Sequence, residues 1–383
     1  MLLDALFLLQ QGSVLAPESP LSWLPGKPSE KTVKVIGRFQ TDFVFVTGGE
    51  DSEAALGETF LDGSEVRRAR LGVEGAFTDE VKYKFEMDFA GGTAAPTDMF
   101  LQIAGPVGNW RVGHFKEPFS LEEQTSSRFI TFLERNAVNE AFAPARNAGL
   151  SLSDFDNSMT WAAGFFRDVD RTGRSVNEAW SATGRFVYRP WFEEDGRRLL
   201  HLAAAASLRT PDGEVGFDAS PEVHFGLPDF FGADVADADR ITLLGIEAAF
   251  QEGPFHSQFE WQSAAVSAPT GSPEPSFDGM SVQAGWFLTG ESRGYKTEAG
   301  AWDRVRTETN AFSEGGLGAW EVAARTSTLD LTEGGAADDL NVISLALNWY
   351  LNDATRVMLD VIKPELDAAD DTTVIALRAA FDF

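Results

Sequence analysis

TVIALRAAFDF, the segment from Thr373 to Phe383, alternates between two kinds of side chain. One parity is mainly large and apolar and the other is small or charged; the first set is Ile375, Leu377, Ala379, Phe381 and Phe383. A period of two indicates a β-strand. One apolar face opposite a polar face suits a strand that has lipid on one side and water on the other. An edge strand of a soluble sandwich can alternate equally well, so the fold depends on how often the pattern recurs.

The same alternation returns along most of the chain. In VKYKFEMDF (81–89), every second residue is apolar and the residues between are charged, and only three residues separate it from the similar segment VRRARLGVEGAF (66–77). Comparable segments lie within 33–45, 246–261 and 343–361. Short turns alternate with longer polar loops, as in bacterial outer-membrane barrels. The pattern predicts an all-β fold, a transmembrane antiparallel up-and-down β-barrel of about 16 strands around a water-filled lumen.

The strand count puts both termini on the periplasmic side and the longer connections outside. The expected external connections are 117–146, 168–179, 210–239, 267–278, 331–340 and 364–371. Two features leave the count open by about two strands. Residues 222–225 allow a further strand, and residues 290–315 form an unusually long connection on the short-turn side.

Composition excludes several classes of protein. No apolar run in the 383 residues approaches the roughly eighteen of a spanning helix, so a helical membrane protein is not expected. The formal net charge of −28 argues against a nucleic-acid partner, which requires Lys and Arg to neutralise phosphates. The absence of cysteine excludes disulfides, thiolate metal sites and a cysteine nucleophile.

The first residues resemble an export signal in part. An apolar stretch from Leu2 to Leu9 ends in small residues, although Asp4 interrupts it and no basic residue precedes it. Pro, Ser and Glu then dominate up to Lys31, as in a linker. We interpret residues 1–32 as a signal remnant and linker, with an ordinary disordered terminus as the alternative, and residues 33–383 as the barrel domain.

One external connection differs from the others. After NWRVGHFK (109–116), about thirty residues, 117–146, carry too many apolar side chains for a solvated loop tip. These side chains are Phe119, Leu121, Phe129, Ile130, Phe132, Leu133 and Phe142. Because the lumen is the available cavity, we expect this loop to fold inward and narrow the pore, bringing Arg128, Arg135 and Arg146 beside Lys116.

Several separated stretches resemble the phosphate-selective porins O and P. They are GHFKEPFSLEE (113–123), SSRFITFLERN (126–136), FAPARNAG (142–149), WFLTGESRGYK (286–296), GAWEVAARTSTLDL (318–331) and LNWYLNDATRVMLDV (347–361). The resemblance covers residues 33–383 and implies an outer-membrane barrel, usually a homotrimer, that passes phosphate or other anions by diffusion. It also implies that residues 117–146 are the constriction loop and that arginines and lysines along the pore draw the anion through.

Guanidinium and ammonium groups along a lumen offer an oxyanion several weak neighbouring sites. By parity, the lumen candidates from the strands are Arg38, Arg68, Arg70, Lys82 and Lys84, together with Lys34, Arg185, Arg189, Arg209, Arg325, Arg356 and Arg378. The loop candidates, Lys116, Arg128, Arg135 and Arg146, rest on the match to the family's constriction loop. For each residue, the alternative is a solvated or salt-bridged side chain of the barrel interior.

The excess of acidic over basic residues leaves other functions open. Carboxylates lie near the candidate cations, namely Glu74, Glu86, Asp88, Glu117, Glu122, Glu123, Glu134 and Glu140. A mixed-charge lumen would make the protein a weakly selective general porin for small solutes. A soluble, acid-rich β-module that acts in binding or at a surface is the alternative from another class. Repeated apolar parity favours the barrel, with outer-membrane lipid and lipopolysaccharide around it.

An enzymatic function is not expected. The four histidines, His114, His201, His224 and His256, are far apart and show no metal-ligand spacing. The chain has no GxSxG motif and no Gly-rich phosphate loop. We therefore predict neither a catalytic site nor a metal or other cofactor.

Overall fold

The computed structural model describes residues 31–50, 53, 59–170, 172–175, 179–227, 231–269, 271–313, 315–334, 339–365 and 372–383. The interpretation of residues 1–32 as a signal remnant and linker concerns a segment that lies almost wholly outside the described residues. Within the described part of the chain, no helix combines the length and the apolar character needed to cross a membrane.

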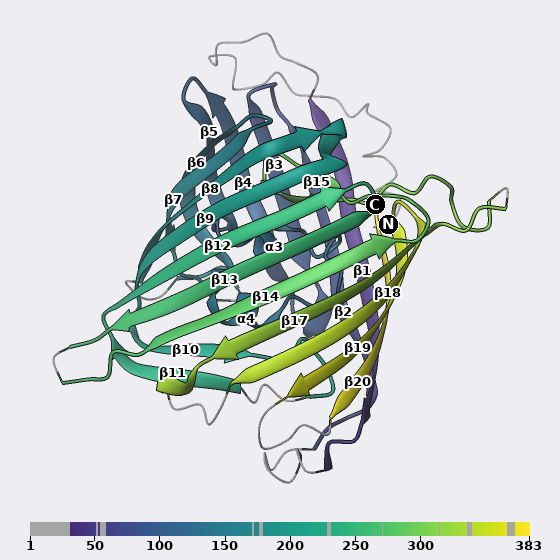
Figure 1. The fold of residues 1–383 in the computed structure, drawn as a ribbon. Helices are drawn as coiled ribbons and strands as arrows, with labels where there is room; N and C mark the ends of the chain where they lie inside the picture. The colour runs from purple at the N-terminus through teal and green to yellow at the C-terminus, as the bar shows by residue number, and fades with distance from the viewer. Residues whose placement is uncertain are drawn as a thin grey trace.

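Sixteen antiparallel strands form a closed barrel, as predicted (Figure 1). They are β1 (Thr32–Thr47), β2 (Gly63–Ala76), β3 (Val81–Asp88), β4 (Ala95–Gly105), β5 (Gly108–Lys116), β6 (Arg146–Phe155), β7 (Met159–Arg167), β8 (Trp180–Glu193), β9 (Arg198–Thr210), β12 (Arg240–Glu252), β13 (Phe255–Ser267), β14 (Ser276–Phe287), β17 (Ala319–Asp330), β18 (Leu340–Asn352), β19 (Thr355–Glu365) and β20 (Thr373–Asp382). Each strand pairs with the next one in this series, and β20 closes the barrel against β1.

The alternation in the sequence corresponds to the two faces of the barrel wall. In β20, Leu377 and Phe381 are exposed on the outside, whereas Arg378 is fully buried inside. The closing register sets Arg378 opposite Asp42 and Phe381 opposite Phe39, whose ring stacks on it. Closure satisfies the backbone groups of both end strands, which a membrane-spanning sheet requires.

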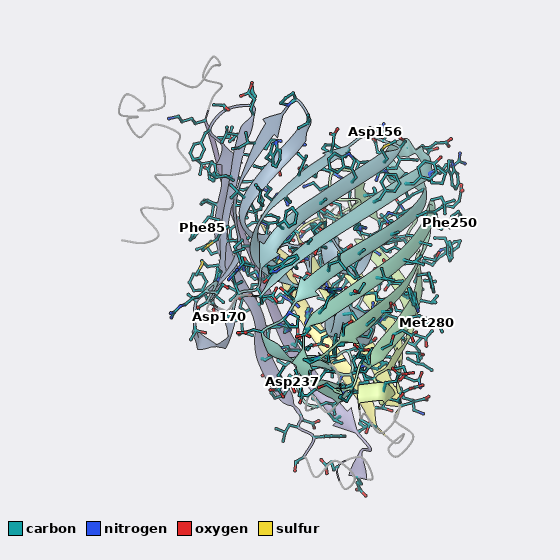
Figure 2. The ribbon with its side chains drawn as sticks, turned by 90° about the vertical axis from the view of Figure 1, so that its left-hand side faces the viewer. Phe85, Asp156, Asp170, Asp237, Phe250 and Met280 are labelled. Carbon is teal, nitrogen blue, oxygen red and sulfur yellow. The ribbon has the colours of Figure 1, made fainter. Side chains whose placement is uncertain are left out.

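The two ends of the barrel differ as predicted. Short turns lie at one end, at residues 77–80, 106–107, 156–158, 194–197, 253–254 and 353–354, and identify it as periplasmic. Longer connections lie at the other end. Figure 2 shows Asp156 at the short-turn end, with Asp170 and Asp237 toward the opposite end. Among the described connections, 3-10 turns occur at η1 (Ala90–Gly92), η2 (Glu194–Gly196) and η3 (Thr332–Gly334).

In the part of the chain that the structure describes, three segments fold against the inside of this wall. Loop 3, residues 117–145, carries α3 (Leu121–Gln124) and α4 (Ala137–Phe142). Loop 5, residues 211–239, contains the separate two-stranded sheet of β10 (Gly213–Ala219) and β11 (Phe231–Ala238). The long periplasmic connection contains a small hairpin, β15 (Gly294–Lys296) and β16 (Ala301–Asp303), here called the inner hairpin. Residues 222–225 form no strand, so the count stays at sixteen.

Candidate pore and constriction

Loop 3 lies inside the barrel, as its apolar content predicted. Phe119, Leu121, Ile130, Phe132 and Leu133 are all essentially inaccessible to solvent. The first of its two short helices, α3, is capped by Ser120, whose hydroxyl accepts a hydrogen bond from the Glu123 backbone at 3.1 Å. Because these side chains replace water inside the barrel, the loop is a packed partition of the lumen.

The barrel wall holds the backbone of loop 3 at several points. Arg356 donates to the carbonyl of Ile130 at 2.8 Å, and Arg378 donates to the carbonyl of Leu133. A carboxylate oxygen of Asp360 accepts the Leu133 amide at 2.8 Å. These contacts satisfy backbone groups of the loop that are not hydrogen-bonded within a helix or strand, and they fix the position of the loop.

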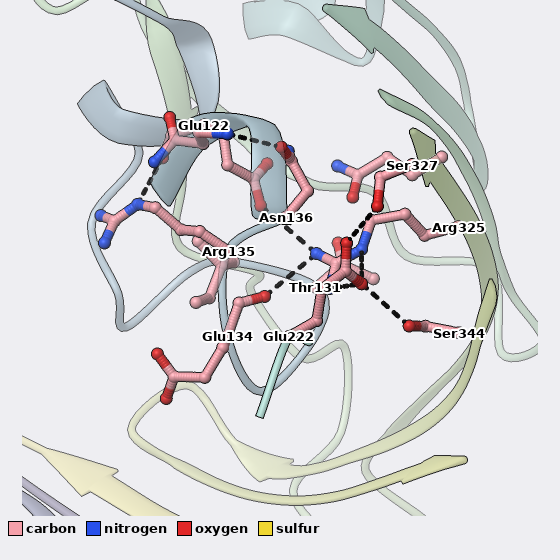
Figure 3. A network of polar contacts seen from close by, with 12 residues as sticks. Glu122, Thr131, Glu134, Arg135, Asn136, Glu222, Arg325, Ser327 and Ser344 are labelled. Carbon is pink, nitrogen blue, oxygen red and sulfur yellow. Dashed lines mark hydrogen bonds and ion pairs between the residues drawn. The ribbon is translucent and has the colours of Figure 1, made fainter. Parts of the chain in front are cut away.

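Loop 5 packs against loop 3 and reaches the wall through Glu222, whose contacts with Arg325, Ser327 and Ser344 are seen in Figure 3. This buried carboxylate accepts two hydrogen bonds from Arg325, at 2.9 and 2.6 Å, and one each from Ser327 and Ser344, at 2.6 and 3.0 Å. Apolar contacts add to this anchor, since Phe217 of β10 packs edge-on against Phe142 of α4. The two loops thus share one apolar core with strands β9, β12 to β14 and β17 to β20, and with Val44 of β1.

The inner hairpin approaches loop 3 from the periplasmic end. The hydroxyl of Tyr295 lies 2.7 Å from Nδ1 of His201, and Trp302 donates to Gln258 at 2.8 Å. Beside the hairpin, Arg293 donates to the carbonyl of Phe129 at 2.8 Å. Arg304 lies over the Phe129 ring, 5.0 Å from its centroid. Loop 3 and the hairpin therefore form one internal partition.

This partition leaves a cavity of about 560 Å³ between itself and strands β1 to β8. Nine cationic side chains line it, namely Arg38, Lys82, Lys84, Arg111, Lys116, Arg128, Arg146, Arg185 and Lys296. Four acidic side chains line it, namely Glu74, Asp98, Glu298 and Asp303. The cations in the lining thus outnumber its carboxylates by five, in a chain whose net charge is −28. Carboxylates outside the lining, namely Glu86, Glu123, Glu247 and Asp382, form ion pairs with five of these cations.

The structure brings most of the predicted strand residues to the lumen, but in ion pairs. Arg38 donates to Glu86 at 3.1 Å, and Arg70 contacts Asp88 at 2.7 Å. Lys84 bridges Glu86 and Asp98, at 3.1 and 2.7 Å.

Glu134, near the tip of loop 3, receives three arginines. Arg67, Arg68 and Arg378 contact it at 2.9, 2.8 and 2.6 Å. Burial alone would raise the pKa of Glu134, but these arginines outweigh that effect and hold the pKa well below its ordinary value. Of the predicted site residues, Arg68 is therefore occupied by a carboxylate of the chain itself.

The predicted loop residues are also paired. Lys116 and Arg135 both contact Glu123, at 3.0 and 3.1 Å. Arg146 binds Asp98 at 2.7 Å, and Arg128 lies 3.4 Å from Asp382. Arg135 does not line the cavity, whereas the other three do.

Lys82 differs from the other predicted residues, because it makes no ion pair with any described side chain. The register sets Lys82 opposite Gln102 and Gln102 opposite Arg111, so that all three form one row across β3, β4 and β5. The Arg111 guanidinium lies over the Phe100 ring, 4.3 Å from its centroid, and donates to Gln102 at 2.6 Å. No described carboxylate lies within ion-pair distance of Arg111 either.

Arg111 was missing from the predicted set although its parity indicates the lumen. Its neighbours Trp110 and Val112 are exposed on the outer face, which places Arg111 on the inner one. The apolar Phe115 has the same parity as Arg111 and obscures the pattern of the segment. In the row of Lys82 and Arg111, the cations line the cavity without an ion pair to a described carboxylate.

We expect the stability contributed by Glu123 to depend on pH. Burial raises the pKa of this carboxyl, but Arg135 and Lys116 outweigh burial and lower it to about 2, from an ordinary value of 4.5. A lowered folded-state pKa contributes stability that is complete above pH 4.5 and is lost as the pH falls towards 2. Above pH 5, Glu123→Gln should lower the free energy of unfolding by on the order of 2 kcal/mol.

Urea titration of the bilayer-embedded protein at a series of pH values measures this difference. The gap between wild type and Glu123→Gln should shrink below pH 4.5. A gap that stays constant down to pH 2 would contradict the assigned ion pairs of Glu123.

The histidines serve packing and hydrogen bonding in the described structure. His201 contacts Glu247 at 3.3 Å, and His256 contacts Glu321 at 2.7 Å, both in the barrel interior. His114 lies 2.6 Å from the carbonyl of Thr97, and His224 contacts Glu65 at 2.8 Å. Among the residues that the structure describes, no cluster of His, Asp and Glu is arranged to hold a metal ion.

Comparisons with known proteins agree with this geometry. A model of the family "Phosphate-selective porin O and P" matches residues 33–383. An uncharacterised protein of Caulobacter vibrioides is 31% identical over 350 residues, covering 86% of this chain and 68% of that protein. Porin O of Pseudomonas aeruginosa is 26% identical over 398 residues, covering 88% of this chain and 84% of Porin O.

Solved structures share the fold at low sequence identity. A loop L8 deletion mutant of OmpT, an outer membrane protein of Vibrio cholerae, has a TM-score of 0.59 at 13% identity and covers 92% of this chain and 99% of its own. OprB of Pseudomonas putida has a TM-score of 0.55 at 7% identity, with coverages of 92% and 94%. Both likenesses show the barrel architecture.

Proposed function

Because the chain belongs to the phosphate-selective porin O and P family, we propose that it passes small anions, including phosphate, across the outer membrane by passive diffusion. Family and fold make the protein an outer-membrane channel. The preference for anions is supported by one observation above all, the nine cations and four carboxylates around the cavity. In a narrow, low-dielectric passage such a surplus raises the local concentration of anions.

Within this passage, the unpaired cations are the best candidates for contact with the permeant ion. Lys82 and Arg111 form no ion pair with a described carboxylate, although Glu298 lies beside their row and accepts a hydrogen bond from Gln102 at 3.3 Å. An oxyanion at Lys84 or Arg146 must instead compete with Asp98, which forms ion pairs with both. Several weak sites in sequence permit entry without trapping, which conduction requires. The proposal therefore moves the main anion contact from the constriction-loop cations to the row on β3 and β5.

A weakly selective general porin is the second candidate. The ion pairs of Glu86, Asp98 and Glu123 favour it, because each carboxylate offsets a lumen cation. We also propose a homotrimer surrounded by lipid and lipopolysaccharide. One solved form of the structurally similar OmpT of Vibrio cholerae is described as a trimer. We assign no catalytic step and no cofactor.

Titration of phosphate against chloride current in planar bilayers tests phosphate preference. We expect phosphate to reduce the chloride current in a saturable way. In Asp98→Asn the block should strengthen by roughly tenfold, equivalent to about 1.4 kcal/mol, because Lys84 and Arg146 lose their shared competitor.

Glu214→Gln is the matched control, since Glu214 is exposed on β10 away from the cavity. An anion-selective current that phosphate does not reduce, in wild type or Asp98→Asn, would favour the general porin and contradict phosphate preference.

A further inference from the structure

The periplasmic connection between β14 and β17 continues beyond the inner hairpin and emerges outside the barrel wall. In Figure 1 this green segment projects sideways from the short-turn end. It presents two large apolar side chains, Phe312 and Leu317, which are 82% and 67% exposed. We call Phe312 and Leu317, with the Trp320 and Trp349 rings beneath them, the periplasmic foot.

The foot is fixed to the outside of the wall. The indole N–H groups of Trp320 and Trp349 both donate to the carbonyl of Leu317, at 3.2 and 2.8 Å. The two indole rings stack with centroids 5.1 Å apart, and Phe312 packs edge-on against Trp349 at 5.5 Å. The amide of Ala311 donates to the carbonyl of Leu351 at 2.7 Å. These hydrogen bonds and ring contacts hold the segment in one position against the outer face of the wall.

Phe312 is held in an unfavourable backbone conformation while its side chain stays exposed. Its φ of 63° lies in the left-handed region, which costs a bulky residue of order 1–3 kcal/mol. Among the described residues, its ring packs edge-on against Trp349, and its amide donates to the carbonyl of Gly316 at 3.1 Å within the turn. Because its ring is 82% exposed on a turn that is fixed in this way, Phe312 is a candidate for contact with a partner outside the chain.

The surrounding surface identifies the kind of partner. Trp286 and Leu288, at the same end of the barrel, are also exposed on the outside. Further along β18, Leu345 and Ile343 continue the apolar outer face towards the middle of the wall. The foot thus extends the lipid-facing surface at its periplasmic edge, where aromatic girdles contact the headgroup region.

We propose that the periplasmic foot inserts into the inner leaflet of the outer membrane, at the boundary between phospholipid headgroups and acyl chains. Phe312 and Leu317 occupy the apolar side of this boundary, and the indoles of Trp320 and Trp349 lie at its polar side. The foot thereby anchors to the bilayer the same periplasmic connection that contains the inner hairpin.

Spin labelling tests the proposal directly, because the chain has no cysteine and each introduced cysteine is unique. Phe312→Cys is labelled with a nitroxide in phosphatidylethanolamine–phosphatidylglycerol vesicles, and its collisions with oxygen and with a water-soluble nickel chelate are measured. Leu345→Cys, on the middle of β18, is the lipid reference. Asn157→Cys, in the exposed turn 156–158, is the water reference.

We expect the label at position 312 to collide with the nickel chelate several-fold less often than the label at 157, and with oxygen more often. Heat-modifiable gel mobility verifies that each variant folds, and Leu317→Cys provides a second label in the same foot. Equal nickel collisions at 312, 317 and 157 would overturn the proposal. Spin–spin broadening that disappears on dilution with unlabelled protein would also overturn it, by identifying a second copy as the partner.

Discussion

Replacement of Glu222 by alanine is expected to lower the free energy of unfolding by about 3–5 kcal/mol, because it leaves a buried charge without its main partner. Arg325 is itself fully buried and makes two hydrogen bonds to Glu222, while its other carboxylate neighbour, Glu122, is 3.6 Å away. Ser327 and Ser344 lose their acceptor in the same variant. A buried donor without an acceptor adds to the cost.

Urea titration in lipid vesicles, followed by the loss of heat-modifiable gel mobility, measures the effect. Glu214→Ala is the control, since it removes the same charge from an exposed position of the same loop and should change stability by less than about 0.5 kcal/mol. Equal stabilities of the two variants would show that Glu222 does not anchor loop 5.

The second large effect concerns selectivity. Lys82→Glu combined with Arg111→Glu changes the lining from nine cations and four carboxylates to seven and six. We expect the reversal potential in a potassium chloride gradient to move from the anion side to near zero, because the surplus of positive charge almost disappears. The effect should weaken in concentrated salt, which screens the lining charges.

A matched pair separates the pore lining from the total charge. Lys363→Glu with Arg240→Glu makes the same charge change at exposed positions outside the cavity. These substitutions should leave the reversal potential nearly unchanged. If both double variants shift it equally, the row of Lys82 and Arg111 does not set selectivity.

Much of the fold could be predicted from the sequence because a barrel wall imposes a period of two on every strand. β20 and β18 show it clearly, with apolar side chains outside and Arg378 or Asn348 inside. The inner hairpin escaped prediction because three-residue strands carry no measurable period. Strands β10 and β11 also alternate between apolar and polar side chains, yet they pack on loop 3 instead of joining the barrel. Tertiary contacts decide between these two positions.

The candidate site could be predicted only in part. Parity placed Arg38 and Lys84 in the lumen, and the apolar content of loop 3 predicted its inward fold. The ion-pair partners of these cations could not be predicted, because they are distant in the sequence. Arg38 pairs with Glu86, 48 residues away, and Arg68 pairs with Glu134, 66 residues away. Which cations stay free, Lys82 and Arg111 among them, depends on those distant partners and is therefore a property of the folded chain.

The reversal potential of the wild-type channel in a potassium chloride gradient tests the central claim most directly. The lining of the cavity contains five more cations than carboxylates, which predicts a potential on the anion side, although the chain as a whole carries −28. A potential on the cation side would contradict the proposed anion preference. It would mean that Glu74, Asp98, Glu298 and Asp303 dominate the field along the passage.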